Sequence, residues 1–212
     1  MNLPKPIKFE VERYIGGLSQ LKKILNPIKL SSNESALGPS PKAIEVFKKE
    51  KNKIFKYPES DSTSLREVLS NKFKIDTQRI ICGSGSDQIF DLTCHLFIQP
   101  GDEVIVTEFG FIMHKIYASL HGAKVILAKE KNFRASVEEI IKKVSDKTKI
   151  VFIANPNNPT GTYLSKNEML DLRKKLRSDI LLVVDDAYFE FIDSDNFSSG
   201  LDLFKDSANV LI

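Results

Sequence analysis

The chain has 212 residues, of which 42% are hydrophobic and 28% are charged, and its formal net charge is +3. This composition is typical of a globular protein and excludes collagen, low-complexity disorder and a disulfide-rich mini-protein. The length allows one or two domains with a core that needs no disulfide or metal. Lysines are scattered along the chain, which indicates solvated helix faces rather than a nucleic-acid surface.

The cysteines and the N-terminal sequence predict no disulfide, metal site or targeting signal. Cys82 and Cys94 are too few for a disulfide framework, and with the three histidines they form no spacing typical of a zinc site. We expect both cysteines to be buried, reduced thiols. The sequence after Met1 shows no signal peptide, and no apolar run approaches the roughly 20 residues of a membrane span. We therefore expect a cytoplasmic protein with no membrane partner and no metal site.

The chain then alternates between two kinds of pattern. Residues 1–35 contain several prolines and are weakly periodic, so we expect them to form an arm. Beyond the arm, short apolar runs predict buried strands. They cover residues 79–82, 104–107, 124–128, 150–154, 180–184 and 210–212.

Helical patterns with recognisable starts lie between these runs. The predicted starts are Ser40 before Pro41, Asp87, and the capping boxes Ser136–Glu139 and Ser165–Glu168. The inward faces are expected to be Ile89, Leu92, Leu96 and Phe97 in one helix, and Val137, Ile140, Ile141 and Val144 in another. Strands that alternate with single helices predict an α/β fold, in which helices cover both faces of a mainly parallel sheet. Because residues 210–212 look like the opening of a further strand, we expect the chain to be a fragment.

Three polar clusters follow predicted strands, where parallel sheets bind ligands. The first is Gly83-Ser-Gly-Ser-Asp87, whose small residues and free helix N–H groups favour a phosphate. Gln88 stands where the dinucleotide fingerprint has its third glycine, and no Gly-Lys-Ser/Thr follows as in a Walker A loop. A plain strand-to-helix turn is the alternative.

The second cluster is Asn155-Pro-Asn-Asn-Pro-Thr-Gly161, in which two prolines restrain the backbone around Asn158. A rigid amide there could donate a hydrogen bond to a ligand oxygen, although the same loop could serve only as a turn.

The third cluster contains Asp185, Asp186 and Tyr188. A carboxylate at the end of a buried strand needs a cation, either a metal or a protonated ring nitrogen. A Walker B segment would require the phosphate-loop lysine that is absent here. Neighbouring residues of a strand point to opposite faces, so the two acids are not expected to serve one site.

Together the clusters suit pyridoxal 5′-phosphate. The turn over residues 85–87 would take its phosphate, and Asp185 would keep its ring nitrogen protonated, so that the ring acts as an electron sink. Asn158 and Tyr188 would reach the 3-oxygen, and Phe111 would cover one ring face. Ordinary core packing is the alternative role for Phe111.

These motifs carry a family resemblance. Residues 154–161 and 184–188 are similar to the hallmark of aminotransferases related to aspartate aminotransferase, and most of all to the histidinol-phosphate aminotransferases. Supporting stretches are residues 13–14, 30–34, 37–42, 57–58, 65–66, 83–87, 100–103 and Phe111.

The resemblance implies an aspartate-aminotransferase-like fold, a homodimer with shared active sites, and bound pyridoxal phosphate. Residues 1–35 would be the arm and part of a small domain, and residues 36–212 an incomplete large domain. The backbone of Gly85, Ser86 and Asp87 would hold the phosphate, which Tyr57 reaches from the neighbouring subunit. Tyr14 and Asn33 would line the substrate pocket.

Three departures from the family pattern matter. Asp186 replaces a usual glutamate, and His114 replaces a frequent tyrosine. The Schiff-base lysine is expected after Ile212, and Lys166 is no substitute because it lies in a helix cap. The segment alone is therefore expected to be inactive.

The implied reaction moves an amino group between histidinol phosphate or its imidazole-acetol phosphate partner and 2-oxoglutarate or glutamate, in histidine biosynthesis. Alternatives are another amino-acid aminotransferase, a phospho-amino-acid decarboxylase of the same fold, or a non-catalytic module that binds the cofactor or only dimerises.

Overall fold

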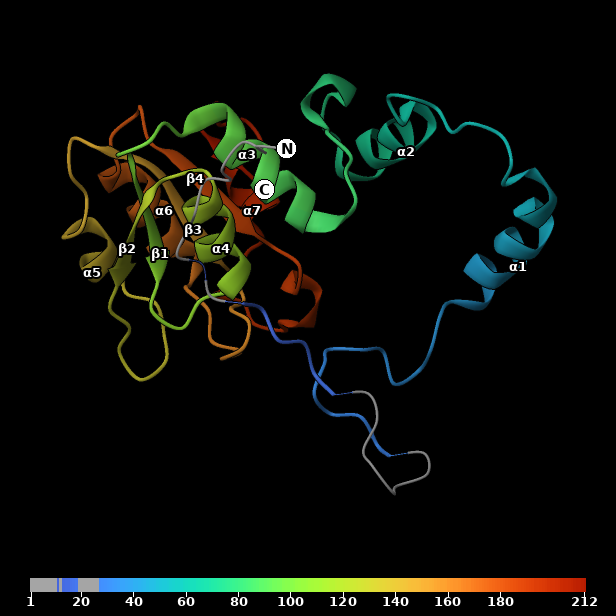
Figure 1. Ribbon diagram of the computed structural model, residues 1–212, viewed down its shortest axis with the longest axis horizontal. Helices are drawn as coiled ribbons and strands as arrows, with labels where there is room; N and C mark the ends of the chain where they lie inside the picture. Colours follow the sequence, from blue (N-terminus) through green and yellow to red (C-terminus); the bar gives the residue numbers. More distant parts are fainter. Residues whose placement is uncertain (1–10, 12, 19–26) are drawn as a thin grey trace, which may run out of the picture. The chain divides into compact units, whose positions relative to one another are not determined.

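The computed structural model of the chain describes residues 11, 13–18 and 27–212 (Figure 1). Much of the predicted arm over residues 1–35 thus lies outside the described residues. The chain divides into two compact units, a larger one built on Gly83–Ile212 and a smaller one over Arg13–Cys82, and each is described by itself. Among the described helices, none has the length and apolar character that crossing a membrane requires.

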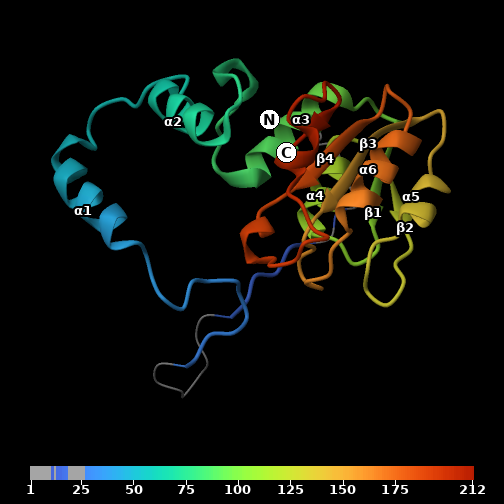
Figure 2. The ribbon, with the colours of Figure 1, turned by 180° about the vertical axis from the view of Figure 1, so that it is seen from behind.

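The larger unit is a parallel sheet wrapped by helices (Figures 1 and 2). Its described strands are β1 (Glu103–Thr107), β2 (Lys124–Ala128), β3 (Thr148–Ala154), β4 (Leu181–Asp185) and β5 (Val210–Leu211). They pair in the order β2-β1-β3-β4-β5, and every pair is parallel. Five of the six predicted strands are therefore confirmed to within about two residues, as is the mainly parallel sheet.

Helices pack on both faces of this sheet because its strands are apolar on both. The helices are α3 (Gly85–Phe97), α4 (Ile112–Leu120), α5 (Val137–Ile141), α6 (Lys166–Lys175) and α7 (Gly200–Phe204), with a short 3-10 helix, η3 (Phe189–Phe191). One core cluster joins Ile105, Ile153 and Leu182 of the strands to side chains of α5, α6 and α7. The other joins Val104, Phe152 and Val183 to α3 and α4. Alternate residues of each strand thus feed opposite cores.

Three of the four predicted helix starts are N-cap positions, and one of the two predicted capping boxes is complete. Ser165 and Glu168 form a complete capping box at the start of α6, and the Ser136 hydroxyl caps α5 by accepting from the Glu139 N–H. Ser40 precedes Pro41, the first residue of α1 (Pro41–Glu50), but its side chain makes no capping hydrogen bond. Val137 and Ile140 are buried as expected, and Ile141 and Val144 pack beside them.

Three predictions about the region before β1 are wrong. Residues 79–82 form no strand, because no neighbouring backbone among the described residues pairs with them, and Ile81 is exposed. The N-cap of α3 is Ser84 rather than Asp87, which lies in the first turn. The buried face of α3 is Phe90, Thr93 and Cys94, while Leu96 and Phe97 are exposed. The spacing of Phe90 and Cys94, four residues apart, defines the face that meets the sheet.

The smaller unit contains α1, η1 (Lys51–Lys53), α2 (Thr63–Phe73) and η2 (Thr77–Arg79). Arg66 ties α2 to η2 through hydrogen bonds from Nε and Nη2 to the Thr77 carbonyl, at 3.1 and 2.6 Å. Neither α1 nor α2 buries a side chain among the described residues. The predicted domain boundary at residue 35 stays a prediction, because these units do not test it.

The two thiols make a prediction that tests this core. Cys94 is fully buried, and burial raises the pKa of its thiol to about 12, whereas Cys82 is half-buried. Because the thiolate is the reactive form, iodoacetamide should label Cys82 in the native protein and Cys94 only after denaturation. Peptide mass mapping measures both sites. Equal labelling of the two cysteines in the native protein would contradict the packing of α3 on the sheet.

Candidate functional site

Four predicted site residues of the larger unit, Phe111, Asn158, Asp185 and Tyr188, lie at or shortly after the ends of β1, β3 and β4. These strands are neighbours in the sheet, so the loops that follow them lie along one edge. Ala154, the last residue of β3, pairs with Asp185, the last residue of β4. The Asn155 N–H also donates to the Asp185 carbonyl at 3.0 Å. The start of the asparagine loop and the acidic cluster are therefore held side by side.

Side-chain and backbone hydrogen bonds close the loop that carries Asn158. The buried Asn155 amide bonds the Leu164 backbone twice, donating to its carbonyl at 3.2 Å and accepting from its N–H at 2.7 Å. The Asn157 N–H donates to the Thr162 carbonyl at 2.8 Å, and the Gly161 N–H donates to Asn157 at 2.8 Å. Asn158 is half-buried at the tip of this closed loop. The predicted rigidity of Asn158 thus has a structural basis in its neighbours.

Asp185 faces a buried histidine. Its side chain is 9% exposed, and its Oδ2 lies 3.4 Å from Nε2 of His114, whose side chain is 2% exposed. Asp185 Oδ1 accepts from the Ala187 N–H at 3.1 Å. His114 Nε2 has no hydrogen-bond partner within the described part of the chain. A carboxylate buried to this extent is stabilised by a cationic or N–H partner.

Aromatic rings hold His114 in place. Its ring stacks on Phe152 with centroids 4.9 Å apart and meets the edges of Phe90 and Phe111 at 4.7 and 5.6 Å. Phe90 belongs to α3, His114 to α4 and Phe152 to β3. Asp185 therefore contacts a histidine whose ring is held in place by residues of α3, α4 and β3.

Asp186 points to different partners, as the strand geometry predicts. Its Oδ2 accepts from the Gly200 N–H at the start of α7 at 2.6 Å, and its Oδ1 is buried without a partner among the described residues. Burial raises the pKa of Asp186 to about 7. This acid anchors α7 and does not share the surroundings of Asp185.

The start of α3 has the form of an anion cradle. Gly85 has φ +75°, a left-handed conformation that favours glycine, and a Cβ there would meet nothing within 4 Å. The Ser84 N–H donates to Oε1 of Gln88 at 2.6 Å, so Gln88, at the position where the dinucleotide fingerprint would have its last glycine, braces this turn. Gly85 and Ser86 are exposed and Asp87 is half-buried. Phe90, one turn further along α3, touches His114 and so links this helix start to the acid.

Phe111 and Tyr188 lie beside the same edge. Phe111 is the N-cap residue of α4 and is half-buried. The Gly110 N–H donates to the Thr107 carbonyl at 3.1 Å, and a Cβ on Gly110 would lie 2.5 Å from Thr107 Oγ1, so a larger residue there would force the Thr107 side chain to move. Tyr188 is half-buried two residues beyond Asp186, with its ring 6.2 Å from that of Phe191.

Tyr14, Asn33 and Tyr57 belong to the smaller unit. Tyr57 and Tyr14 are exposed there, as is Asn33. Because each unit is described by itself, the predicted roles of these three residues stay predictions.

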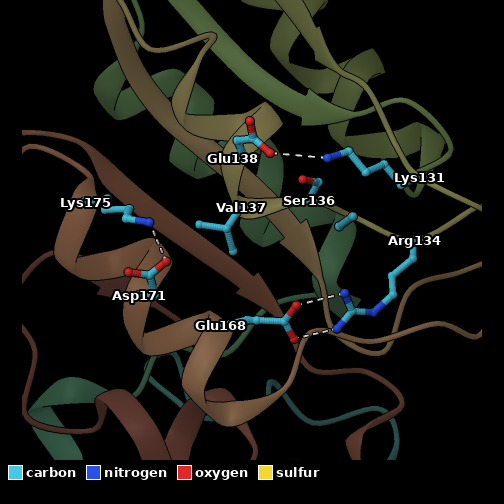
Figure 3. A pocket seen from close by; sticks show the side chains of 9 residues that line it. Lys131, Arg134, Ser136, Val137, Glu138, Glu168, Asp171 and Lys175 are labelled. Atoms are coloured by element: carbon cyan, nitrogen blue, oxygen red, sulfur yellow. Dashed lines mark hydrogen bonds and ion pairs between the residues drawn. The ribbon is translucent and has the colours of Figure 1, made fainter.

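A separate cavity of about 290 Å³ lies between α5 and α6 (Figure 3). Figure 3 shows Glu168 facing Arg134, with hydrogen bonds of 2.8 and 2.5 Å from the guanidinium. Those bonds hold the pKa of Glu168 well below its usual range, at about 2. Lys175 pairs with Asp171, and Lys131 with Glu138. These charges neutralise one another, and no predicted site residue lines the cavity, so we assign it a structural role.

The fold and this sheet edge define a class of protein. The family model for aminotransferase class I and II matches residues 26–212, and the chain belongs to that family.

Within this family, the chain is similar in sequence to histidinol-phosphate aminotransferases. The chain is 55% identical over its whole length to histidinol-phosphate aminotransferase of Pelagibacter ubique and covers 59% of that protein. It is 42% identical over 99% of its length to histidinol-phosphate aminotransferase of Paramagnetospirillum magneticum and covers 58% of that one. The chain thus spans less than two thirds of the curated relatives it matches.

Solved structures share the fold. Histidinol-phosphate aminotransferase from Sinorhizobium meliloti, in complex with pyridoxal-5′-phosphate, matches with a TM-score of 0.79 at 23% identity, over 84% of this chain and 49% of that one. Aspartate aminotransferase from Rhizobium meliloti matches with a TM-score of 0.75 at 21% identity, over 85% and 49% of the two chains. The predicted aspartate-aminotransferase-like fold is confirmed.

The structure also shows contacts that the sequence did not predict. They are the approach of His114 to Asp185, the bond from Asp186 to Gly200, and the bonds of Asn157 and Glu130 to the Phe109 backbone. His114 departs from the family pattern at its position, but the sequence does not indicate that it approaches Asp185. The other three give no signal in a single sequence.

Asp186 makes the stability of the larger unit depend on pH. Its folded pKa of about 7 lies above the ordinary value of 3.8. Its contribution to stability is therefore fully present below pH 3.8 and is lost as the pH rises through 7. Between pH 5 and pH 8 the loss should be on the order of 2 kcal/mol, measured by urea unfolding. Asp186→Asn should flatten this dependence, and an unchanged slope in that variant would show that another group titrates.

Proposed function

We propose that the protein carrying this chain is a pyridoxal-phosphate-dependent aminotransferase that acts on histidinol phosphate. The observation that carries the proposal is 55% identity over the whole chain to a histidinol-phosphate aminotransferase, combined with a sheet edge that suits the cofactor. The reaction would exchange an amino group between histidinol phosphate and 2-oxoglutarate, in histidine biosynthesis.

The residues at the sheet edge fit pyridoxal phosphate by their chemistry. The open turn at Gly85 offers backbone N–H groups of Ser86 and Asp87 to a phosphate, at the positive end of α3. The buried carboxylate of Asp185 would accept a hydrogen bond from a protonated ring nitrogen. The positive charge of that nitrogen would offset the free-energy cost of burying the carboxylate. Asn158 and Tyr188 would bond the 3-oxygen, and Phe111 would cover a ring face.

When bound, the cofactor supplies an aldehyde that takes up the amino group and a ring that withdraws electrons. The chain's own part is to hold and orient that ring. Asp185 would keep a proton on the ring nitrogen, because its carboxylate is only 9% exposed and its charge is less screened there than in water. His114, clamped by three phenylalanines, limits the movement of Asp185.

The base that moves the proton at the substrate carbon is not assigned within these residues. Lys166 follows the N-cap of α6, and its Nζ donates to the Asp195 carbonyl at 3.2 Å. We place the Schiff-base lysine after Ile212. Reading the coding sequence in frame beyond Ile212 tests this directly: a Ser-Lys segment within roughly fifteen codons supports the proposal. A stop codon there favours a non-catalytic cofactor-binding module.

A homodimer is part of the same proposal. Tyr57 is fully exposed, as a side chain that reaches a neighbouring subunit would need to be. The smaller unit also leaves Phe47, Phe55 and Leu65 exposed, which favours a partner surface. The cytoplasmic location stays a prediction from the sequence.

Cofactor binding can be tested without the lysine. Pyridoxine 5′-phosphate lacks the aldehyde, so it measures the non-covalent site alone. Asp185→Ala should raise its Kd at least tenfold, because the ring nitrogen loses its charged partner. The matched control is Asp186→Asn, the neighbouring acid that faces α7, which should leave the Kd within twofold. Isothermal titration calorimetry measures the Kd of each variant. An equal rise in Kd for the two variants would refute the role of Asp185.

Substrate choice needs the complete enzyme and a panel of amino donors with 2-oxoglutarate. Histidinol phosphate should give the highest kcat/KM. A preference for phenylalanine would favour another amino-acid aminotransferase, and release of carbon dioxide from a phospho-amino acid would favour a decarboxylase of this fold.

A further inference from the structure

The backbone around Phe109 is held from both sides. Its N–H donates to Oε1 of Glu130 at 3.1 Å, and its carbonyl accepts from Nδ2 of Asn157 at 3.0 Å. Glu130 follows β2, and Asn157 lies in the loop after β3, so two separate segments grip one residue of the loop after β1. We call Glu130 and Asn157 the Phe109 clamp.

The clamp residues are costly to keep, which argues against an incidental contact. Asn157 is 8% exposed and its Oδ1 is buried without a partner in the described residues, and the same holds for Oε2 of Glu130. An unpaired buried oxygen is destabilising, because its hydrogen bonds to water are lost on folding. Apolar side chains would fill the same places without that cost. What the polar groups provide is a fixed direction for the Phe109 N–H and carbonyl.

The clamp acts two residues from the predicted ring-stacking side chain. Between Phe109 and Phe111 lies only Gly110, whose N–H is bonded to the Thr107 carbonyl and whose Cα lies close against the Thr107 side chain. Beyond Phe111 the chain enters α4 at once. Once the Phe109 backbone is held, little rotational freedom remains for the backbone that carries Phe111.

We propose that Asn157 and Glu130 are positioning residues that fix Phe111 against the face of the cofactor ring by holding the Phe109 backbone. This inference rests on the proposed function, because Phe111 needs a bound pyridine ring to cover. Asn157 is thereby distinguished from its neighbour Asn158: Asn158 would touch the cofactor, whereas Asn157 acts through Phe109.

The experiment measures the Kd of pyridoxine 5′-phosphate for the chain by calorimetry. Asn157→Asp keeps the size of the side chain but replaces the donor with an acceptor that faces the Phe109 carbonyl. We expect its Kd to rise at least fivefold, in line with the loss of one buried hydrogen bond. The control is Thr160→Val, which removes the other partner of Asn157 Nδ2 and should leave the Kd within twofold.

Glu130 gives a second, independent pair of variants. Glu130→Gln keeps an oxygen that accepts from Phe109 and should bind as the unmodified chain does. Glu130→Met fills the same space without an acceptor and should weaken binding about fivefold. Equal Kd values for the two Glu130 variants would overturn the proposal, even if Asn157→Asp does not fold.

A double-mutant cycle separates positioning from general support of the structure. In a Phe111→Ala background, Asn157→Asp should change the Kd by less than twofold, because the side chain through which it acts is gone. Additive effects would mean a merely structural role. Coupling to Asn158→Ala in place of Phe111→Ala would mean that Asn157 acts through its neighbour, and either result overturns the inference.

Failure of the proposed function has its own signature. If the unmodified chain does not bind pyridoxine 5′-phosphate, the cofactor assignment fails and the inference fails with it. If the unmodified chain binds and the cycle is additive, the inference alone fails.

Discussion

The parallel pairing of β3 with β4 is the constraint on which the site depends. Ala154 lies opposite Asp185, and the Asn155 N–H reaches the Asp185 carbonyl, so the asparagine loop and the acid leave the sheet at the same level. A slip of one residue would turn Asp185 to the other face and bring Asp186 into its place. The two apolar cores resist such a slip, because each strand feeds both. Packing of the two apolar cores therefore determines which side chains lie at the carboxyl ends of β3 and β4.

Burial then gives the two neighbouring acids different properties. Asp185 meets the ring of His114 and the Ala187 N–H, in a place where a cationic ring nitrogen would offset its desolvation. Asp186 meets the start of α7, and its pKa is raised to about 7 by burial. The end of β4 thus carries one acid that we propose binds the cofactor and one that anchors α7, and the alternation of side chains keeps the two apart.

The sequence predicts what is local and misses what depends on a distant partner. The runs at 124–128 and 150–154 are strands because their own apolar residues suit burial on both faces. The equally apolar run at 79–82 is not, since a strand also needs a neighbour's backbone. In α3 the apolar residues outnumber those one face can hold, and the sheet selects Phe90 and Cys94. The clamp on Phe109 joins residues far apart in the chain, and no spacing rule reaches that far.

The division into two units helps to explain why a shared fold does not identify the substrate. Apart from Tyr57, the residues proposed to hold the cofactor lie in the larger unit, above its two apolar cores. Tyr14 and Asn33, which we expect to meet the substrate, lie in the smaller unit. Structures of a histidinol-phosphate and an aspartate aminotransferase both match the chain at low identity, so the fold alone does not select between their substrates. Evidence for the substrate comes instead from relatives with high identity over the whole chain. One fold can host many reactions, and in the proposed assignment the residues that recognise the substrate are separate from the sheet edge that would hold the cofactor.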